Sequence, residues 1–213
     1  MQDNVLALVY SFAFIIAVIA LAFVLYRTIH LSSESVRKII HIGVSNWVFI
    51  LVWCFDDVRF AVVGPVAFII LNAIFVHSGA AGLLGMGDRR RDNGLVYFPF
   101  SLLVMTLLYY RGLIQAHDVI AATLVMGYGD GLAALVGSKI GRHRYSVLNA
   151  SKSWEGTAVM FVVSSLVIAL FTPYPALKVL VMAVVATLFE ALTPLGLDNI
   201  TVPLLTALSG ALI

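Results

Sequence analysis

The chain contains apolar runs that are long enough to cross a lipid bilayer. The first, Val5–Tyr26, is unbroken by charge, and Asp3 is the only charged residue before it. A run of about 20 apolar residues predicts a transmembrane helix. Because the basic start of a signal peptide is missing, we expect this helix to be retained.

Further apolar runs follow, separated by polar segments. They are Ile39–Phe55, Phe60–Val76, Leu95–Tyr110, Val119–Gly137, Trp154–Phe171 and Ala176–Leu192. A short last run, Ile200–Ile213, is either a tilted or partial eighth helix or a segment that ends inside the bundle. Only 11% of the residues are charged, against about a quarter in soluble domains, so the chain is an integral membrane protein. We predict one all-α domain, residues 1–213, forming a polytopic bundle of seven to eight transmembrane helices.

Basic residues gather in the loops after the first, third and fifth runs. These loops hold Arg27, Arg37, Lys38, Arg89, Arg90, Arg91, Lys139, Arg142, Arg144 and Lys152. By the positive-inside rule these loops are cytoplasmic and the N-terminus is outside. The net charge of +2 is too small to indicate a nucleic-acid partner.

Asp130 is a carboxylate inside the fifth apolar run, where a charge is costly and indicates a function. Ala133, Gly137 and Gly141 follow at helical spacing, and such a small-residue face lets a neighbouring helix or a ligand come close. Helix packing alone would explain the glycines, but it would not explain Asp130. We therefore expect Asp130 to bind a metal or the substrate.

The loop after this run carries four fixed positive charges, on Lys139, Arg142, Arg144 and Lys152. Such loops often serve only to fix topology or to contact anionic lipid. Lys152 also precedes a helix start, where backbone N–H groups attract phosphate. Glu155 could hold a metal or neutralise a basic neighbour, or it is simply a favourable first-turn acid.

Two further groups of polar residues lie near the predicted cytoplasmic boundary. Arg37 or Lys38 shares a helix face with His41, although a membrane anchor would explain Arg37 alone. The run Arg89–Arg91 is either a solvated loop or a phosphate clamp.

Glu190, Asp198 and Asn199 supply oxygen ligands suited to a hard cation such as Mg²⁺. The alternative for Asp198 and Asn199 is a helix cap.

Several motifs together resemble the CTP-dependent polyprenol kinases, which include dolichol kinase and phytol kinase. The central one joins Asp130, Ala133, Gly137 and Gly141, through a basic loop, to Lys152-Ser153-Trp154-Glu155-Gly156. Ser151 stands where the family has a first lysine, Ser153 replaces a threonine, and the loop is one residue longer. Arg37-Lys38 with His41, the segment 93–99 and the segment 196–203 also resemble parts of the family.

The resemblance implies a phosphotransferase. It would move the terminal phosphoryl group of CTP to the hydroxyl of a long-chain isoprenoid alcohol, such as phytol, geranylgeraniol, a polyprenol or dolichol, at the cytoplasmic membrane face. Such transfer needs metal-bound carboxylates and cations on the triphosphate.

The residues expected to act in this transfer fall into three sets. The catalytic residues are Asp130, Lys152, Glu155 and His41. The nucleotide-binding residues are Gly131, Ala133, Gly137, Lys139, Gly141, Arg142, Arg144, Ser153, Gly156, Arg37 and Lys38. The residues expected to hold Mg²⁺ are Asp130, Glu190, Asp198 and Asn199.

Other activities stay open on the sequence alone. The Lys152–Gly156 motif also resembles CDP-diacylglycerol synthases, although the chain lacks their paired-aspartate ending. A diacylglycerol kinase, a prenyl-phosphate kinase and a phosphatidate cytidylyltransferase are therefore alternatives. A transporter would also use a broken helix with a buried acid, but no second matching segment is present. The sequence is compatible with a homo-oligomer, and it fixes neither the alcohol's length nor the nucleotide.

Overall fold

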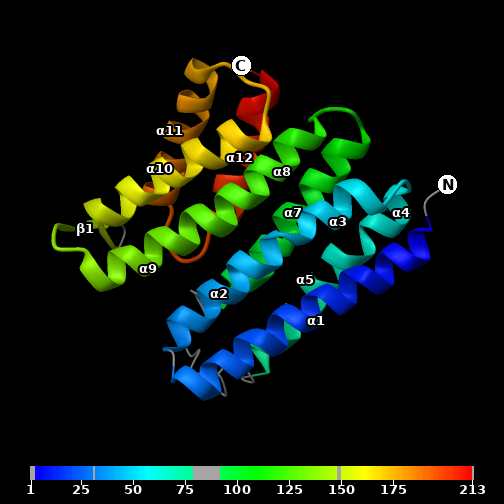
Figure 1. Ribbon diagram of the computed structural model, residues 1–213, viewed down its shortest axis with the longest axis horizontal. Helices are drawn as coiled ribbons and strands as arrows, with labels where there is room; N and C mark the ends of the chain where they lie inside the picture. Colours follow the sequence, from blue (N-terminus) through cyan, green and yellow to red (C-terminus); the bar gives the residue numbers. More distant parts are fainter. Residues whose placement is uncertain (1–2, 31, 79–91, 148–149, 213) are drawn as a thin grey trace.

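The computed structural model describes residues 3–30, 32–78, 92–147 and 150–212. In this part of the chain it consists of helices and one short β-hairpin (Figure 1). The elements before the hairpin are α1 (Asn4–Ile29), α2 (Ser33–Ser45), α3 (Trp47–Cys54), α4 (Val58–Ala61), α5 (Val63–His77), α7 (Gly94–Tyr110), α8 (Ala116–Leu124), a π-helical turn η2 (Val125–Asp130) and α9 (Gly131–Ile140). The hairpin strands are β1 (Arg144–Val147) and β2 (Ala150–Ser153), and α10 (Trp154–Phe171), α11 (Ala176–Leu192) and α12 (Asp198–Leu212) follow.

The predicted all-α membrane class is confirmed. Five described helical stretches are long and apolar enough to cross a bilayer, and Gly94–Tyr110 is a shorter apolar helix. The five stretches are Asn4–Ile29, Ser35–Cys54, Val58–His77, Ala116–Ile140 and Trp154–Phe171. The sixth and seventh predicted runs have the same bounds as α10 and α11. We predicted seven to eight transmembrane helices, and these five stretches do not confirm that number.

The two ends of the bundle differ in what they carry. At one end, here called the hairpin end, lie the C-terminal end of α1, the beginning of α2, the end of α9 and the β-hairpin (Figure 1). The N-terminal end of α1 and the turn between α7 and α8 lie at the opposite end (Figure 1). The hairpin end therefore gathers the segments in which the sequence places most of its basic residues.

The structure differs from the predicted elements in two places that matter for the site. The second helix begins at Ser33, before the apolar run that starts at Ile39, so Arg37 and Lys38 share a helix with His41 as predicted but lie inside it and not at its start. The basic loop is also more ordered than predicted, because β1 and β2 pair antiparallel with Tyr145 opposite Lys152. Each feature restricts the position of one lysine, Lys38 in α2 and Lys152 in β2, which would move more freely in a loop.

Small residues allow the helices around Asp130 to pack closely. A Cβ atom added at Gly131 would lie 2.6 Å from Cγ1 of Ile42 in α2, and one added at Gly127 would overlap Ser45. A Cβ at Gly156 would lie 2.9 Å from the carbonyl oxygen of Ala133, between α10 and α9. The helix-packing role considered for the small residues is therefore present in the structure.

Candidate active site

A cavity of about 700 Å³ lies among the helices and reaches the hairpin. Its volume is typical of a small-molecule site. Charged residues from six separate elements line it. Among the described residues these are Arg37, Lys38, Asp130, Arg144, Lys152, Glu190 and Asp198, with His41 beside them.

Asp130 and Lys38 form an ion pair in this cavity. Nζ of Lys38 lies 2.5 Å from Oδ2 of Asp130, and the two side chains are only 11% and 7% exposed. Nε2 of His41 lies 4.0 Å from the same oxygen and has no hydrogen-bond partner. A buried carboxylate needs a compensating charge, and Lys38 supplies it.

The backbone around Asp130 explains how it reaches Lys38. Asp130 is the last residue of the π-helical turn η2, which interrupts the helix running from Ala116 to Ile140. Single π-turns are rare and occur frequently at functional sites. Gly131, which follows Asp130, lets α2 approach closely enough for Lys38 to meet it, while Gly129 on the other side faces Met160 and Ser164 of α10.

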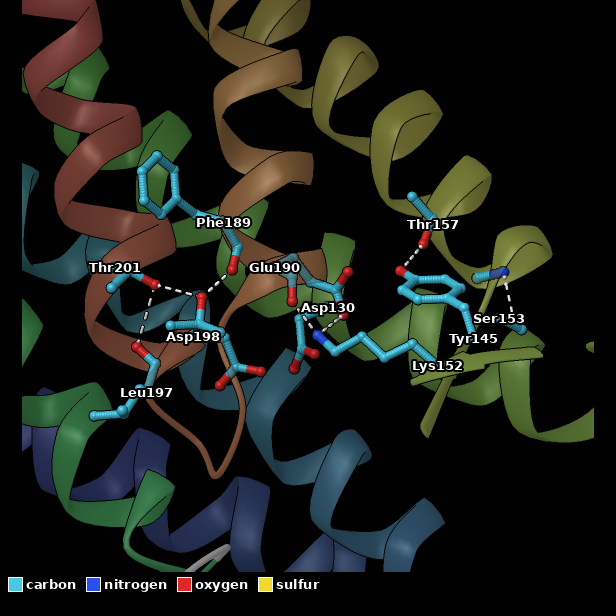
Figure 2. A network of polar contacts seen from close by, with 12 residues as sticks. Asp130, Tyr145, Lys152, Ser153, Thr157, Phe189, Glu190, Leu197, Asp198 and Thr201 are labelled. Carbon is cyan, nitrogen blue, oxygen red and sulfur yellow. Dashed lines mark hydrogen bonds and ion pairs between the residues drawn. The ribbon is translucent and has the colours of Figure 1, made fainter. Parts of the chain in front are cut away.

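A second ion pair joins the hairpin to α11. Nζ of Lys152 donates to Oε1 of Glu190 at 2.6 Å and also to the backbone carbonyl of Glu190. In Figure 2 the ammonium group of Lys152 points toward both Glu190 and Asp130. Burial disfavours the charged form of Lys152, but the nearby carboxylates of Glu190 and Asp198 outweigh it and raise the pKa of Lys152 above its ordinary value.

The hairpin holds Lys152 in place through its own contacts. The hydroxyl of Tyr145, the residue opposite Lys152, lies 2.6 Å from the hydroxyl of Thr157 in α10 (Figure 2). Oγ of Ser153 accepts from the backbone N–H of Gly156 at 3.1 Å and so caps α10. The predicted helix start is therefore present, with Lys152 directed into the cavity next to it.

Asp198 and Asn199 also line the cavity. Oδ1 of Asp198 accepts from the backbone N–H of Asn199 at 2.9 Å, and the Asn199 amide donates to Asp198 and to the carbonyl of Gly196. These contacts tie Asp198 to its immediate neighbour at the start of α12, and they differ from a helix cap, in which the side chain accepts from the N2 or N3 backbone N–H. The second carboxylate oxygen of Asp198 takes no part in them.

The carboxylates of this cavity suit a metal ion that arrives with a nucleotide. In the part of the chain that the structure describes, no three His, Cys, Asp or Glu side chains cluster closely enough to hold a metal by themselves. Asp130, Glu190 and Asp198 nevertheless share one cavity. Mg²⁺ is commonly held by one or two carboxylates together with substrate phosphates. The donor set therefore fits Mg²⁺ bound to a phosphate chain better than a bare ion.

The small-residue stripe forms one wall of the cavity. Ala133, Gly137, Ser153 and Gly156 all line it. A Cβ atom at Gly137 would lie 2.9 Å from Oγ of Ser153, so the glycine keeps α9 close to the hairpin. The same small residues therefore let the helices pack closely and line the cavity.

Some predicted site residues lie outside the cavity wall. Gly131, Lys139, Gly141, Arg142 and Glu155 do not line it. Glu155 instead accepts from Nδ1 of His143 at 2.8 Å and from the His143 backbone N–H. Lys139 and Arg142 are exposed. The nucleotide and catalytic roles expected for these residues stay predictions, and the run Arg89–Arg91 lies outside the described residues.

The segments 93–99 and 196–203, which resemble parts of the family, meet at the cavity. A Cβ atom at Gly94 would lie 3.0 Å from Nδ2 of Asn199 and 3.4 Å from Cα of Gly196. The side chain of Asn72, a residue that stands alone in the sequence, donates to the carbonyl of Leu95 at 2.7 Å. All of these residues line the cavity, together with Arg37, Lys38 and His41.

The cavity also has an apolar limb, which sequence reasoning missed. The side chains that form it come from α1, α2 with α3, α5 and α7. They include Ile15, Ile19, Val44, Trp47, Phe68, Phe98 and Leu102. The spacing of Ile40, Val44 and Trp47 follows one helix face, but an apolar face in a membrane helix looks the same whether it meets a ligand, a helix or lipid.

Similarity to known proteins agrees with this convergence of motifs. The chain is 36% identical over 204 residues to the phytol kinase of Synechocystis sp., and the match covers 90% of this chain and 84% of that protein. The chain belongs to the phytol kinase family. Among phytol kinase relatives in plants, it is 32% identical over 131 residues to a probable chloroplastic phytol kinase of Triticum aestivum. It is 31% identical over 136 residues to a probable chloroplastic phytol kinase of Oryza sativa subsp. japonica.

The two plant phytol kinases match over a smaller part. The matches cover 54% and 57% of this chain and 42% of each plant protein. No family model matches the chain, and no solved structure does. Membership in the phytol kinase family therefore depends on the Synechocystis relative, which matches over most of both chains.

Proposed function

We propose that the chain is an integral membrane kinase that transfers the terminal phosphoryl group of CTP to the hydroxyl of a long-chain isoprenoid alcohol, using Mg²⁺. One observation supports this most directly. A single cavity joins a cluster of paired lysines and carboxylates to an apolar limb. A kinase for an apolar alcohol needs both, because one substrate is a polyanion and the other is mostly hydrocarbon.

The two lysines exchange partners when the nucleotide binds. Without it, Lys38 neutralises Asp130 and Lys152 neutralises Glu190. The phosphate chain attracts both ammonium groups, and the carboxylates that they leave are then available to hold Mg²⁺. Mg²⁺ held by these carboxylates would neutralise the charge that develops on the transferred phosphoryl group. The chain thus carries its own counter-ions until the substrate replaces them.

The wall next to this cluster receives the rest of the nucleotide. Arg37 and Arg144 line the cavity beside the lysines, and the stripe of Gly137 and Gly156 allows the backbone to come close. The N-terminus of α10, with Ser153 at its cap, adds backbone N–H groups that favour phosphate. We infer CTP as the donor from the resemblance of these motifs to the CTP-dependent family.

The alcohol occupies the apolar limb with its hydroxyl beside Asp130 and His41. Ile19 lines the limb and is 45% exposed on the outer surface of α1, so the limb reaches the lipid-facing side of the bundle. Nε2 of His41 has no hydrogen-bond partner and lies 4.0 Å from Asp130. It accepts the hydroxyl proton as the oxygen attacks the phosphorus and the bond to CDP breaks. We place this reaction at the cytoplasmic face, where the basic loops gather.

The test is phosphoryl transfer by the purified protein in lipid nanodiscs. Geranylgeraniol or phytol is incubated with Mg²⁺ and CTP labelled either at the γ- or at the α-phosphate. We expect γ-label in the lipid product, no α-label, and loss of transfer when EDTA removes the metal. Lipid carrying the α-label would instead indicate a cytidylyltransferase. Transfer only to prenyl monophosphates or to diacylglycerol would replace the proposed acceptor, and transfer from ATP in preference to CTP would replace the donor.

A further inference from the structure

We propose that Trp47, positioned against Gly64, closes the apolar limb and sets the length of isoprenoid chain that the enzyme accepts. This inference rests on the proposed function, because it assigns the limb to the alcohol's tail. It concerns residues that are remote from the charged cluster and that no motif of the sequence includes.

Three helices end the limb at a similar depth. On α2 and α3, the lining face runs from Lys38 to Trp47, which is about 13 Å along the axis at ~1.5 Å per residue. On α5 it runs from Asn72 to Gly64, about 12 Å in the opposite chain direction. The deepest lining residue of α7 is Leu102. The lining on these helices therefore stops at Trp47, Gly64 and Leu102, and Trp47 contributes the largest of their side chains.

The position of the Trp47 ring depends on the absence of a side chain at Gly64. A Cβ atom added there would lie 3.3 Å from Cζ2 of the ring, which is tighter than ordinary van der Waals contact. Trp47 is only 2% exposed, so its ring is held between Gly64 and the core. A methyl group at position 64 would push the ring, while a smaller residue at position 47 would open space beneath the limb.

The opening and the floor of the limb lie at different depths. Ile19 is exposed, whereas Ile15, one turn of α1 closer to the far end, is only 4% exposed. An alcohol entering from the bilayer past Ile19 therefore meets an enclosed wall when its tail continues toward Trp47. Because the hydroxyl must stay at the charged cluster, the space between cluster and floor limits the tail.

The experiment compares two substitutions that change the floor in opposite directions. Wild type, Trp47→Leu and Gly64→Ala are assayed with farnesol, geranylgeraniol and a longer polyprenol, which differ by whole isoprene units. We expect the kcat/KM ratio of the longer to the shorter alcohol to rise about tenfold in Trp47→Leu and to fall by a similar factor in Gly64→Ala. The KM for CTP should change less than about twofold, since neither residue reaches the charged cluster.

Trp53→Ala is the matched control, because Trp53 follows on the same helix and is 62% exposed. Its alcohol profile should equal that of wild type. A variant that merely misfolds would lose activity on all alcohols together and leave the ratio unchanged. Unchanged ratios in floor variants that keep their activity on farnesol would overturn the inference, and would mean that the tail leaves sideways past Ile19. If wild type phosphorylates none of the alcohols, the proposed function itself fails.

Discussion

Nζ of Lys38 and Oδ2 of Asp130 are 2.5 Å apart in space and 92 positions apart in the chain. Their contact joins the family's early motif to its central signature. Because both side chains are almost fully buried, neither is satisfied by water. The pair balances the two buried charges, and in the proposed function it breaks when a phosphate chain and its metal enter.

Asp130→Asn should abolish phosphoryl transfer while leaving the fold intact. The amide keeps the size of the side chain but loses the charge that the metal requires, so we expect kcat to fall by about a hundredfold or more. Transfer of γ-label from CTP to geranylgeraniol measures the loss, and circular dichroism checks helix content. Asp57→Asn is the control, since Asp57 pairs with Arg59 outside the cavity. Full activity in Asp130→Asn would remove its central role.

Lys38→Met should destabilise the protein more than Asp130→Asn does. It leaves the Asp130 carboxylate buried without its partner, which costs about 3–5 kcal/mol in comparable buried pairs. The double variant Lys38→Met with Asp130→Asn should recover most of that stability and stay inactive. Thermal unfolding of the three variants in the same detergent measures the coupling. Equal and additive losses would show that the pair contributes nothing to stability.

Lys152→Gln should raise the KM for CTP by about tenfold or more, because Lys152 is a hairpin cation that lines the cavity next to two carboxylates. Lys139→Gln should have a smaller effect, since Lys139 is exposed and does not line the cavity. Lys178→Gln, in which the lost cation stacks on Tyr174, is the matched lysine control. Initial rates against CTP concentration measure all three. A larger effect from Lys139 than from Lys152 would move the nucleotide out of this cavity.

Tyr174→Phe should reduce stability without affecting catalysis. The Tyr174 hydroxyl donates to Oδ1 of Asp118 at 2.6 Å, and Asp118 is fully buried at the beginning of α8. Removing the donor leaves a buried carboxylate oxygen unsatisfied and should cost about 1–3 kcal/mol. The KM for CTP should not change, because neither residue lines the cavity. Tyr10→Phe, at a tyrosine that is 51% exposed, should leave the unfolding midpoint unchanged.

The sequence by itself determined the class of the protein, several of its helices and the family. Hydropathy is a local property, so runs such as Trp154–Phe171 and Ala176–Leu192 indicated helices with the bounds that the structure has. Asp130 stood out for a similar reason, because a charge in an apolar run is costly wherever the run packs.

Only the tertiary structure decided which residues form the site. Sequence spacing predicts which side chains share a helix face, but not which faces meet. Close approach at Gly131 brings Lys38 to Asp130, and pairing of β1 with β2 directs Lys152 to Glu190. Glu155 is the opposite case: the sequence predicted it for the site, but it contacts His143 and does not line the cavity. The apolar limb could not be predicted from the sequence. An apolar residue looks the same in the sequence whether it contacts lipid, the protein core or a ligand, and only the packed structure distinguishes the three.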